Sequence, residues 1–360
     1  MTRIFLIRHA EAEGNIYRRA HGHHEGRIIG RGFTQIEELK KRFEREKIGA
    51  VYSSDLLRTR TTATAIYEAH NLPLNTTERL REVNVGRWED TAWGDIEYNE
   101  PEQCGWFNSD PAKWSVEGSE GYFHVRRRMV DCISEIARCH DGDTVAVFSH
   151  GFAIRSLLCE LMDVASHEVS KLPYCDNTAV ALLIFENGRL SVEYHGDNSH
   201  LHSGNSTFAN QTWWRGETAW RGENLRYVPL DTGALEQRRR ETGGKFRADM
   251  AFAAFLGNEP VGLLGLDTGR ETGENAGWID TLHIGPEHRR NGFSIQLIGQ
   301  ALSEYRRLGR EKLRIEAENS DRTAAYCAKY GFTGCMSEDN FVMEKDISQN
   351  AAGGVQDRIV

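Results

Sequence analysis

Short apolar runs alternate with amphipathic segments through the first half of the chain. Residues 4–7 and 145–148 are continuous apolar runs, and residues 50–52 form a shorter one. Runs of this length predict strands that are buried on both faces of a mostly parallel sheet. Residues 34–46 and 55–70 lie between these runs and predict helices. We therefore expect a three-layer α/β/α domain in this half of the chain.

A second α/β pattern begins near residue 224, with apolar runs at 260–265 and 278–284 and a helix predicted over 292–308. Between the two patterns, residues 206–223 contain three tryptophans, for which we expect burial between domains, with stacking on a ligand as the alternative. We predict domains at 1–205 and 224–346, a linker at 206–223 and a flexible tail at 347–360.

Length and composition agree with two domains and narrow the classes of partner. A chain of 360 residues exceeds one typical domain, and 39% hydrophobic residues suffice for real cores. No apolar stretch reaches 18 residues, and we expect neither a membrane span nor a signal peptide. The net charge of −9 disfavours a general nucleic-acid binder. The 7 scattered cysteines, without a CxxC pair, predict reduced thiols and a cytoplasmic protein.

Basic side chains follow the predicted strands where a ligand of such a sheet would bind. Arg8 and His9 directly follow the first strand, His150 follows another, and Arg58 lies one turn into a helix. Because ligands of open α/β sheets bind at the carboxyl ends of the strands, these groups should share one rim. A neutral imidazole is a nucleophile toward phosphorus, and arginine forks hold phosphate oxygens. The pattern predicts phosphoryl transfer.

Four sequence blocks resemble the histidine phosphatase, or phosphoglycerate mutase-like, superfamily over about residues 1–195. They read LIRHAEAEGN at 6–15, SSDLLRTRTTA at 53–63, LREVNVGRWE at 80–89 and SHG at 149–151. Ala10 stands where glycine is usual. The resemblance implies that His9 is the phosphorylated nucleophile and that Glu82 is the proton donor. It also implies that the phosphoryl group is bound by Arg8, Arg58 and His150.

The same resemblance suggests further residues of the phosphatase pocket, which are Asn15, His21, Gly22 and Gly151. Glu89 and Asp90 compete with Glu82 for the role of proton donor. His21, His23 and His24 look like a metal cluster, but no second ligand group accompanies them at metal spacing. The family uses no metal, so we expect a pocket-edge loop and no metal ion.

An irregular insert at 99–118, which carries Trp106 and Trp114, is expected to cap the pocket and set the substrate. A mutase must retain its phosphoryl group for a bound product, whereas a phosphatase admits water. Because the domain is compact for a mutase, we favour a phosphatase acting on a small phosphorylated metabolite. A mutase-like domain is the alternative.

In the second half, a strand ends at residue 284, a Gly-Pro turn follows, and residues 289–294 read RRNGFS before a helix. Free N–H groups at such a helix start bind anions. The order of elements over about 226–345 resembles the GNAT acyltransferases, with Ser294 in place of a final glycine or alanine. The resemblance implies binding of acetyl-CoA or another acyl-CoA. The cofactor would lie on Leu282, His283, Ile284, Arg289, Arg290, Asn291, Gly292, Phe293 and Ser294.

The acid and base of acyl transfer are less clear from the sequence. The family often has a tyrosine four residues before its Gly-Phe pair, where this chain has Cys327, with Tyr326 one residue earlier. One residue on a helix is a rotation of about 100°. Cys327, Tyr326 or water remain candidates for the acid, and a buried structural role is the alternative for Cys327. Asp280 and Glu316 are candidates for the base.

Together these patterns predict a bifunctional enzyme that hydrolyses a phosphomonoester and transfers an acyl group to an amine on a small molecule or peptide. A second domain that only senses acyl-CoA is the alternative.

Overall fold

The computed structural model describes residues 1–210, 223–270, 274–317, 325–328, 330–336 and 341–348. The chain divides into two compact units. Unit 1 holds Met1–Asn15, Ala20–Thr91 and Ile96–Glu223, and unit 2 holds Ile16–Arg19, Ala92–Asp95 and Asn224–Val360. None of the helices in the described part of the chain has the length and apolar run that a bilayer crossing needs.

The described residues of unit 1 form a six-stranded sheet in the order β3-β2-β4-β1-β5-β6. Strands β1 to β4 run parallel, whereas β5 pairs antiparallel with both β1 and β6. The strands are β1 (Thr2–Arg8), β2 (Ala50–Ser53), β3 (Leu74–Thr76), β4 (Thr144–Ser149), β5 (Val180–Glu186) and β6 (Arg189–Asp197). The three apolar runs of the sequence are β1, β2 and β4, so the predicted mostly parallel sheet is confirmed.

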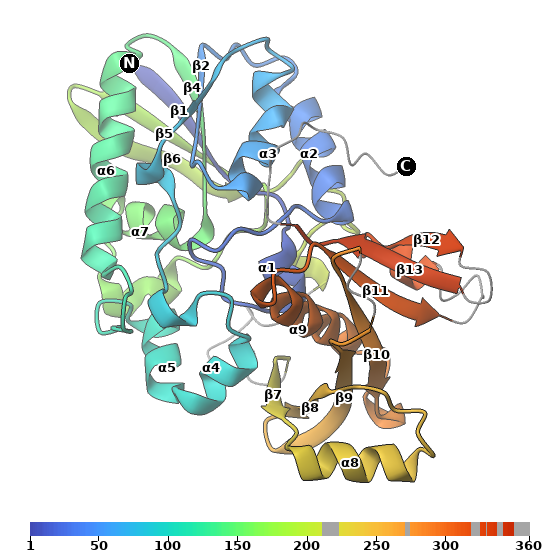
Figure 1. The fold of residues 1–360 in the computed structure, drawn as a ribbon. Coiled ribbons are helices and arrows are strands. Elements are labelled where there is room, and N and C mark those ends of the chain that lie inside the picture. The colour runs from blue at the N-terminus through green and yellow to red at the C-terminus, as the bar shows by residue number, and fades with distance from the viewer. Residues whose placement is uncertain (211–222, 271–273, 318–324, 329, 337–340, 349–360) are drawn as a thin grey trace. The chain divides into compact units, whose positions relative to one another are not determined.

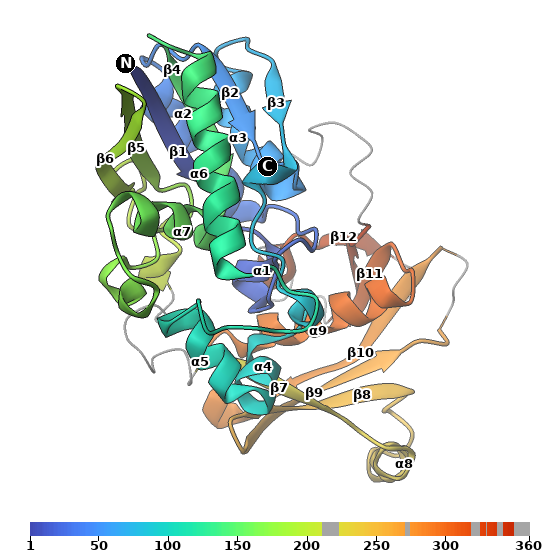
Figure 2. The ribbon, with the colours of Figure 1, turned by 90° about the vertical axis from the view of Figure 1, so that its left-hand side faces the viewer.

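Helices cover both faces of this sheet and complete the three layers (Figures 1 and 2). Helices α2 and α3 pack on one face, and α6 and α7 pack on the other. Helix α2 buries Ile36, Leu39 and Phe43, whose spacing places them on one side of a helix. The helices are α1 (Glu13–Tyr17), α2 (Gly30–Phe43), α3 (Leu57–Tyr67), α4 (Trp93–Asn99), α5 (Pro101–Ser109), α6 (Tyr122–Cys139) and α7 (Gly151–Leu161).

The insert at 99–118 is not irregular throughout, because α5 lies within it. Phe107 of α5 stacks on Phe152 in the first turn of α7, with ring centroids 5.0 Å apart. Trp114 packs against both rings and is buried. The insert therefore supports the start of α7, which follows His150. Whether it also sets the substrate stays a prediction.

Unit 2 contains a seven-stranded sheet, as far as its residues are described, in the order β12-β13-β11-β10-β9-β8-β7. Only β10 and β11 run parallel among these neighbours, so the sheet is mixed, as predicted. The elements are β7 (Leu225–Pro229), α8 (Thr232–Glu241), β8 (Met250–Leu256), β9 (Glu259–Asp267), β10 (Ala276–Ile284), α9 (Phe293–Arg307), β11 (Lys312–Ala317), β12 (Thr333–Met336) and β13 (Phe341–Asp346).

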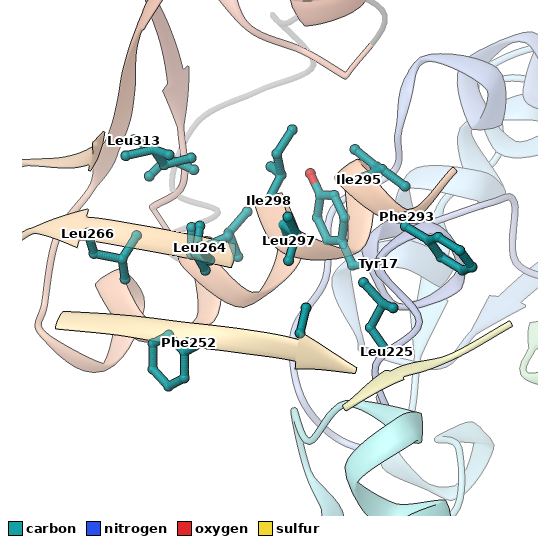
Figure 3. Packing of buried hydrophobic residues seen from close by; sticks show 14 of the residues in the cluster. Tyr17, Leu225, Phe252, Leu264, Leu266, Phe293, Ile295, Leu297, Ile298 and Leu313 are labelled. Carbon is teal, nitrogen blue, oxygen red and sulfur yellow. The ribbon is translucent and has the colours of Figure 1, made fainter. Parts of the chain in front are cut away.

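Helix α9 supplies much of the apolar core of unit 2 (Figure 3). Its Leu297 and Ile298 lie with Leu264 of β9 and Leu313 of β11 in one buried cluster. Tyr17, from the first half of the chain, belongs to the same cluster.

Near the predicted domain boundary, Ser206 and Thr207 still belong to unit 1, since both bond to the Asp176 carboxylate. The predicted linker therefore starts inside an ordered contact. Trp213, Trp214, Trp220 and most of the predicted tail lie outside the described residues.

Candidate active sites

The strand register of unit 1 brings the predicted phosphoryl-binding groups to one rim of the sheet. Arg8 and Ser149 are paired at the ends of the parallel strands β1 and β4. The next residues, His9 and His150, therefore emerge side by side, with ring centroids 5.3 Å apart. Arg58, in the first turn of α3, donates to His150 and joins them. These four side chains, which are more than 90% buried, form one cluster.

The surroundings of His9 leave one ring nitrogen ready to act as a nucleophile. Its Nδ1 lies 2.7 Å from the Ala10 carbonyl, which can only accept, so Nδ1 carries the proton and donates. Nε2 then keeps its lone pair. Burial lowers the pKa of His9 well below its ordinary value, and the guanidinium groups of Arg58 and Arg8 lower it further. His9 is therefore a neutral imidazole near neutral pH.

His150 has the opposite tautomer. Its Nδ1 accepts a hydrogen bond of 3.2 Å from Nε of Arg58, which places the proton on Nε2. That N–H is buried and has no hydrogen-bond partner among the described residues. Burial, followed by Arg58, lowers the pKa of His150 well below its ordinary value. The cluster thus pairs an imidazole that can attack with an imidazole that can donate to an oxygen.

Arg58 is fixed by three acceptors. Besides His150, it donates to the carbonyls of His24 at 3.0 Å and Gly22 at 2.7 Å. Its side chain is only 2% exposed, and burial lowers its pKa, an effect that the Glu82 carboxylate opposes. A guanidinium stays charged in proteins. Arg58 is therefore a positioned cation beside both imidazoles.

Arg8 is held on the other side of the cluster. Its Nη1 donates to the Cys175 carbonyl at 2.5 Å, whereas its buried Nε has no partner among the described residues. A Cβ on Gly151 would lie 3.4 Å from that Nε, an ordinary van der Waals distance, so Gly151 lies directly beside Arg8. Asn15 accepts from the Ala12 amide and stands 3.5 Å from the Asn177 side chain, which itself bonds to the His9 carbonyl. The predicted pocket residues Gly151 and Asn15 thus flank the cluster.

The Glu82 carboxyl contacts the first turn of α7. Its two carboxyl oxygens accept from the amides of Val83, Phe152 and Ala153 at 2.9–3.0 Å. The positive end of the helix dipole points toward that position. These bonds fix the Glu82 carboxyl at the residues that follow His150, and its role as proton donor stays a prediction.

Glu89, the alternative proton donor, bonds to a backbone loop. Its carboxylate accepts from the amides of Gly22, His23 and His24 at 2.7–3.1 Å, and also from Val85. Gly22 fits tightly against it, because a Cβ there would lie 2.4 Å from a Glu89 oxygen. Glu89 thus shapes the loop whose carbonyls bind Arg58. It acts through that loop as a positioning residue, which the sequence alone did not reveal.

In unit 2, the predicted anion-binding loop precedes α9. Gly292 caps the helix with φ of +79°, in the left-handed region that glycine adopts at least cost. Phe293 is buried, whereas Arg290, Asn291 and Gly292 are exposed. The Arg289 side chain donates to the Ile284 carbonyl at 3.0 Å, which ties the loop back to β10.

Strands β10 and β11 separate before they end. They pair from Ala276 to Ile279 on β10, and then the register shifts by a bulge between Ile279 and Thr281 on the β9 side. Leu282, His283 and Ile284 pair only with β9 among the described strands. Among the described strands, these three residues therefore have no partner on the β11 side of β10.

The two candidates for the proton donor of acyl transfer lie in different surroundings. Cys327 is 5% exposed and belongs to the apolar core, and burial raises the pKa of its thiol. This placement favours the alternative interpretation of Cys327 as a buried structural residue. The Tyr326 hydroxyl instead lies 2.6 Å from the Ser294 hydroxyl in the first turn of α9. Burial raises the pKa of Tyr326 to about 12, so it keeps its proton.

The two candidates for the base are engaged in ion pairs. Glu316 bonds to Arg270 and Arg247, and its pKa is lowered chiefly by Arg270. Asp280 accepts from the Arg247 amide. Both carboxylates therefore have structural partners.

Two models of known protein families match the chain. The family model of the histidine phosphatase superfamily (branch 1) matches residues 4–198, which is more than half of the chain. The chain belongs to the histidine phosphatase superfamily. The model of the acetyltransferase (GNAT) family matches residues 217–332 of the same chain. The chain thus also carries a GNAT domain, and both predicted resemblances are confirmed.

Two curated relatives of this chain carry different activity names. Phosphoserine phosphatase 1 of Hydrogenobacter thermophilus is 31% identical over 191 residues, which are 52% of this chain and 89% of the relative. Probable phosphoglycerate mutase GpmB of Yersinia pestis is 29% identical over 213 residues, 56% of this chain and 95% of the relative.

Solved structures resemble the same part of the chain. YhfR of Bacillus stearothermophilus is 27% identical with a TM-score of 0.55, and the match covers 56% of this chain and all of YhfR. A phosphoserine phosphatase from Entamoeba histolytica, solved with 3-phosphoglyceric acid, has a TM-score of 0.51 at 22% identity, covering 56% of this chain and all of that one. At that identity the likeness to the amoebic protein concerns the fold alone.

Proposed function

We propose that unit 1 hydrolyses a small phosphomonoester through a phosphorylated His9. The observation that carries this proposal is the pair of complementary tautomers: Nε2 of His9 has a free lone pair, while Nε2 of His150 carries a proton. Arg8 and Arg58 add two buried cations beside them. A transferring phosphoryl group needs this combination, because its charge spreads over the equatorial oxygens as the bond to the leaving group breaks.

The proposed reaction has two steps. His9 Nε2 attacks phosphorus, the P–O ester bond breaks, and the leaving oxygen takes a proton from the protonated Glu82 carboxyl. Water then attacks phospho-His9, gives its proton to the Glu82 carboxylate, and releases inorganic phosphate. Arg8, Arg58 and His150 hold the phosphoryl oxygens in both steps. Asn15, His21, Gly22 and Gly151 would line the same pocket.

The names of the relatives suggest which substrates to try, and a direct assay tests the reaction type. Because a relative is named as a phosphoserine phosphatase, phosphoserine is the first candidate substrate in a panel of small phosphorylated metabolites. We expect the purified full chain to release inorganic phosphate from at least one of them, with the dephosphorylated alcohol as the other product. Phosphate release is measured colorimetrically and the organic product by mass spectrometry.

A mutase is the second candidate, favoured by the likeness to GpmB. The same panel separates the two, because a mutase with 3-phosphoglycerate would return an isomer that retains its phosphate. Isomerisation without phosphate release would contradict the phosphatase proposal.

For unit 2, we propose that the α9 loop binds acetyl-CoA or another acyl-CoA and that the domain transfers the acyl group to an amine. The backbone edge of β10 at 282–284 suits the pantetheine arm, and residues 289–294 suit the pyrophosphate. Tyr326, hydrogen-bonded to Ser294, is the better placed proton donor. A domain that binds acyl-CoA without transfer is the alternative.

Calorimetry with acetyl-CoA tests this site. We expect binding by the full chain and an affinity about 5- to 30-fold lower in Gly292→Ala, because keeping alanine in the left-handed conformation at the loop that meets the pyrophosphate costs about 1–2 kcal/mol. Gly257→Ala, at another left-handed glycine of unit 2, is the matched control and should bind normally. No binding at millimolar acetyl-CoA would contradict the proposal. Turnover with an amine panel separates transferase from sensor.

A further inference from the structure

Three side chains of unit 1 that take no part in the proposed reaction lie close together at the loop of residues 21–24, whose carbonyls bind Arg58. His21 and His24 come from that loop, and Asp90 lies some 66 residues further along the chain. Their ligand atoms all lie within 4.8 Å of one another. The expectation of no metal rested on the lack of a further ligand group and on the resemblance to a family that uses no metal. Asp90 supplies the further ligand group. We propose that His21, His24 and Asp90 bind a divalent transition-metal ion of the zinc type.

The distances fit a long hydrogen bond between His21 and Asp90, and they also fit the spacing of ligands around one ion. Nε2 of His21 and Nε2 of His24 lie 3.4 and 3.9 Å from Oδ1 of Asp90. An N–H···O hydrogen bond is usually about 2.7–3.2 Å long. Around a tetrahedral ion with bonds of about 2.0–2.1 Å, neighbouring ligand atoms stand about 3.3 Å apart. Small side-chain adjustments would therefore complete the coordination.

The protein backbone holds Asp90 in this place. The Asp90 amide donates to the Ala20 carbonyl and the Ala20 amide donates to the Thr91 carbonyl, both at 2.8 Å. This pairing sets Asp90 opposite the start of the histidine loop. Asp90 has φ of +55°, a left-handed conformation that few non-glycine residues adopt. Strained backbone of this kind is concentrated at functional sites.

His21 is equally constrained. A Cβ on Gly14 or Gly26 would lie 2.7 or 2.8 Å from its Nδ1, so the ring fits only between two glycines. This packing turns Nε2 toward Asp90. The buried Nδ1 has no hydrogen-bond partner among the described residues, which is uncommon for a buried polar atom. The ring is thus placed by its packing and by the Asp90 contact rather than by a hydrogen-bond network at Nδ1.

The donor set selects the kind of ion. Two imidazole nitrogens and one carboxylate oxygen suit Zn²⁺, which binds three protein ligands and keeps an open fourth position in many sites. Mg²⁺ and Ca²⁺ prefer oxygen ligands throughout. The side chains of His21, His24 and Asp90 are 7%, 18% and 12% exposed, so the site is shielded but reachable.

A bound ion would lie next to the phosphoryl-binding cluster without taking part in the attack by His9. The carbonyls of Gly22 and His24, in the same loop, accept the hydrogen bonds that orient Arg58. The ion would therefore fix the loop on which Arg58 depends.

The test uses the full chain after treatment with a chelator and its removal. Zn²⁺ alone is titrated by equilibrium dialysis with metal analysis, and Co²⁺ is used as a spectroscopic probe. We expect the unmodified chain to bind one Zn²⁺. His24→Ala and Asp90→Asn should each lower the affinity for Zn²⁺ about 100-fold or more. Asparagine accepts the left-handed conformation of Asp90, so that variant should keep its fold. Circular dichroism checks folding in each case.

His23→Ala is the matched control. His23 lies in the same loop, but its ring contacts the Glu82 carbonyl at 3.0 Å instead of Asp90. We expect it to bind Zn²⁺ as the unmodified chain does. Bound Co²⁺ should show tetrahedral d–d absorption without a thiolate charge-transfer band. The proposal fails if the chain binds no Zn²⁺, if both ligand variants bind it unchanged, or if the spectrum shows cysteine ligands. These readouts do not depend on phosphatase activity.

Discussion

His9→Ala is expected to abolish phosphate release, with kcat falling by about 10⁴-fold or more. The reason is that the variant loses the group to which the proposal assigns the covalent intermediate, while the buried cations around it remain. Alanine leaves a cavity beside His150 but removes no backbone contact of His9, whose amide donates to the Ser149 carbonyl. Phosphate release from an aryl phosphate and from phosphoserine measures the effect.

His202→Ala is the control for His9→Ala, because its side chain is 88% exposed. We expect the control to keep full activity and both variants to keep the circular dichroism of the unmodified chain. Undiminished turnover by a well-folded His9→Ala protein would refute the assignment of the nucleophile.

Arg58→Met is expected to have the second largest effect, a fall in kcat/KM of about 10³–10⁵-fold. Methionine keeps much of the apolar volume of the arginine stem but removes the charge beside the phosphoryl group. It also leaves Nδ1 of His150 without its donor, so the ring is free to change tautomer and to lose the Nε2 proton that would face a phosphoryl oxygen. Arg58→Lys should recover only a small part of the activity, because an ammonium cannot serve all three acceptors of the guanidinium fork.

Arg60→Met is the matched control on the same helix. Among the described residues, no hydrogen bond joins Arg60 to His9 or His150, whereas Arg58 donates to His150. Its kcat/KM should stay within a few-fold of the unmodified chain. Thermal unfolding of each variant separates lost catalysis from lost folding, because Arg58 also satisfies two buried carbonyls. Equal losses in Arg58→Met and Arg60→Met would show that charge or stability in general, and not the Arg58 fork, explains the effect.

The sequence predicts the parallel core and the central site because both depend on local signals. Apolar runs mark β1, β2 and β4, and polar residues directly after them form the rim. The antiparallel pair β5 and β6 also carries a local sequence signal in its turn. Asn187 and Gly188 join these strands with φ of +52° and +77°, as in a two-residue hairpin turn that favours Asn-Gly.

The remaining features depend on contacts between distant segments, which no local pattern contains. Glu89 meets the amides of Gly22 to His24 across some 65 residues, and Asp90 meets His21 in the same way. The position of Glu89 or Asp90 in the sequence does not distinguish its carboxylate from one that is simply exposed to solvent. In unit 2, a helical rotation of about 100° separates Tyr326 from the position of the family tyrosine, yet its hydroxyl lies 2.6 Å from the Ser294 hydroxyl, a contact between segments 32 residues apart.

The most direct test of the central claim is the identity of the phosphorylated residue. The full chain is mixed with a phosphate-labelled substrate, quenched in alkali within milliseconds, and digested for mass spectrometry under conditions that preserve phosphohistidine. We expect an acid-labile phosphoryl group on Nε2 of His9, formed and lost at rates consistent with turnover, and no label in His9→Ala. A phosphoryl group on another residue, or steady turnover without any covalent label, would contradict the account.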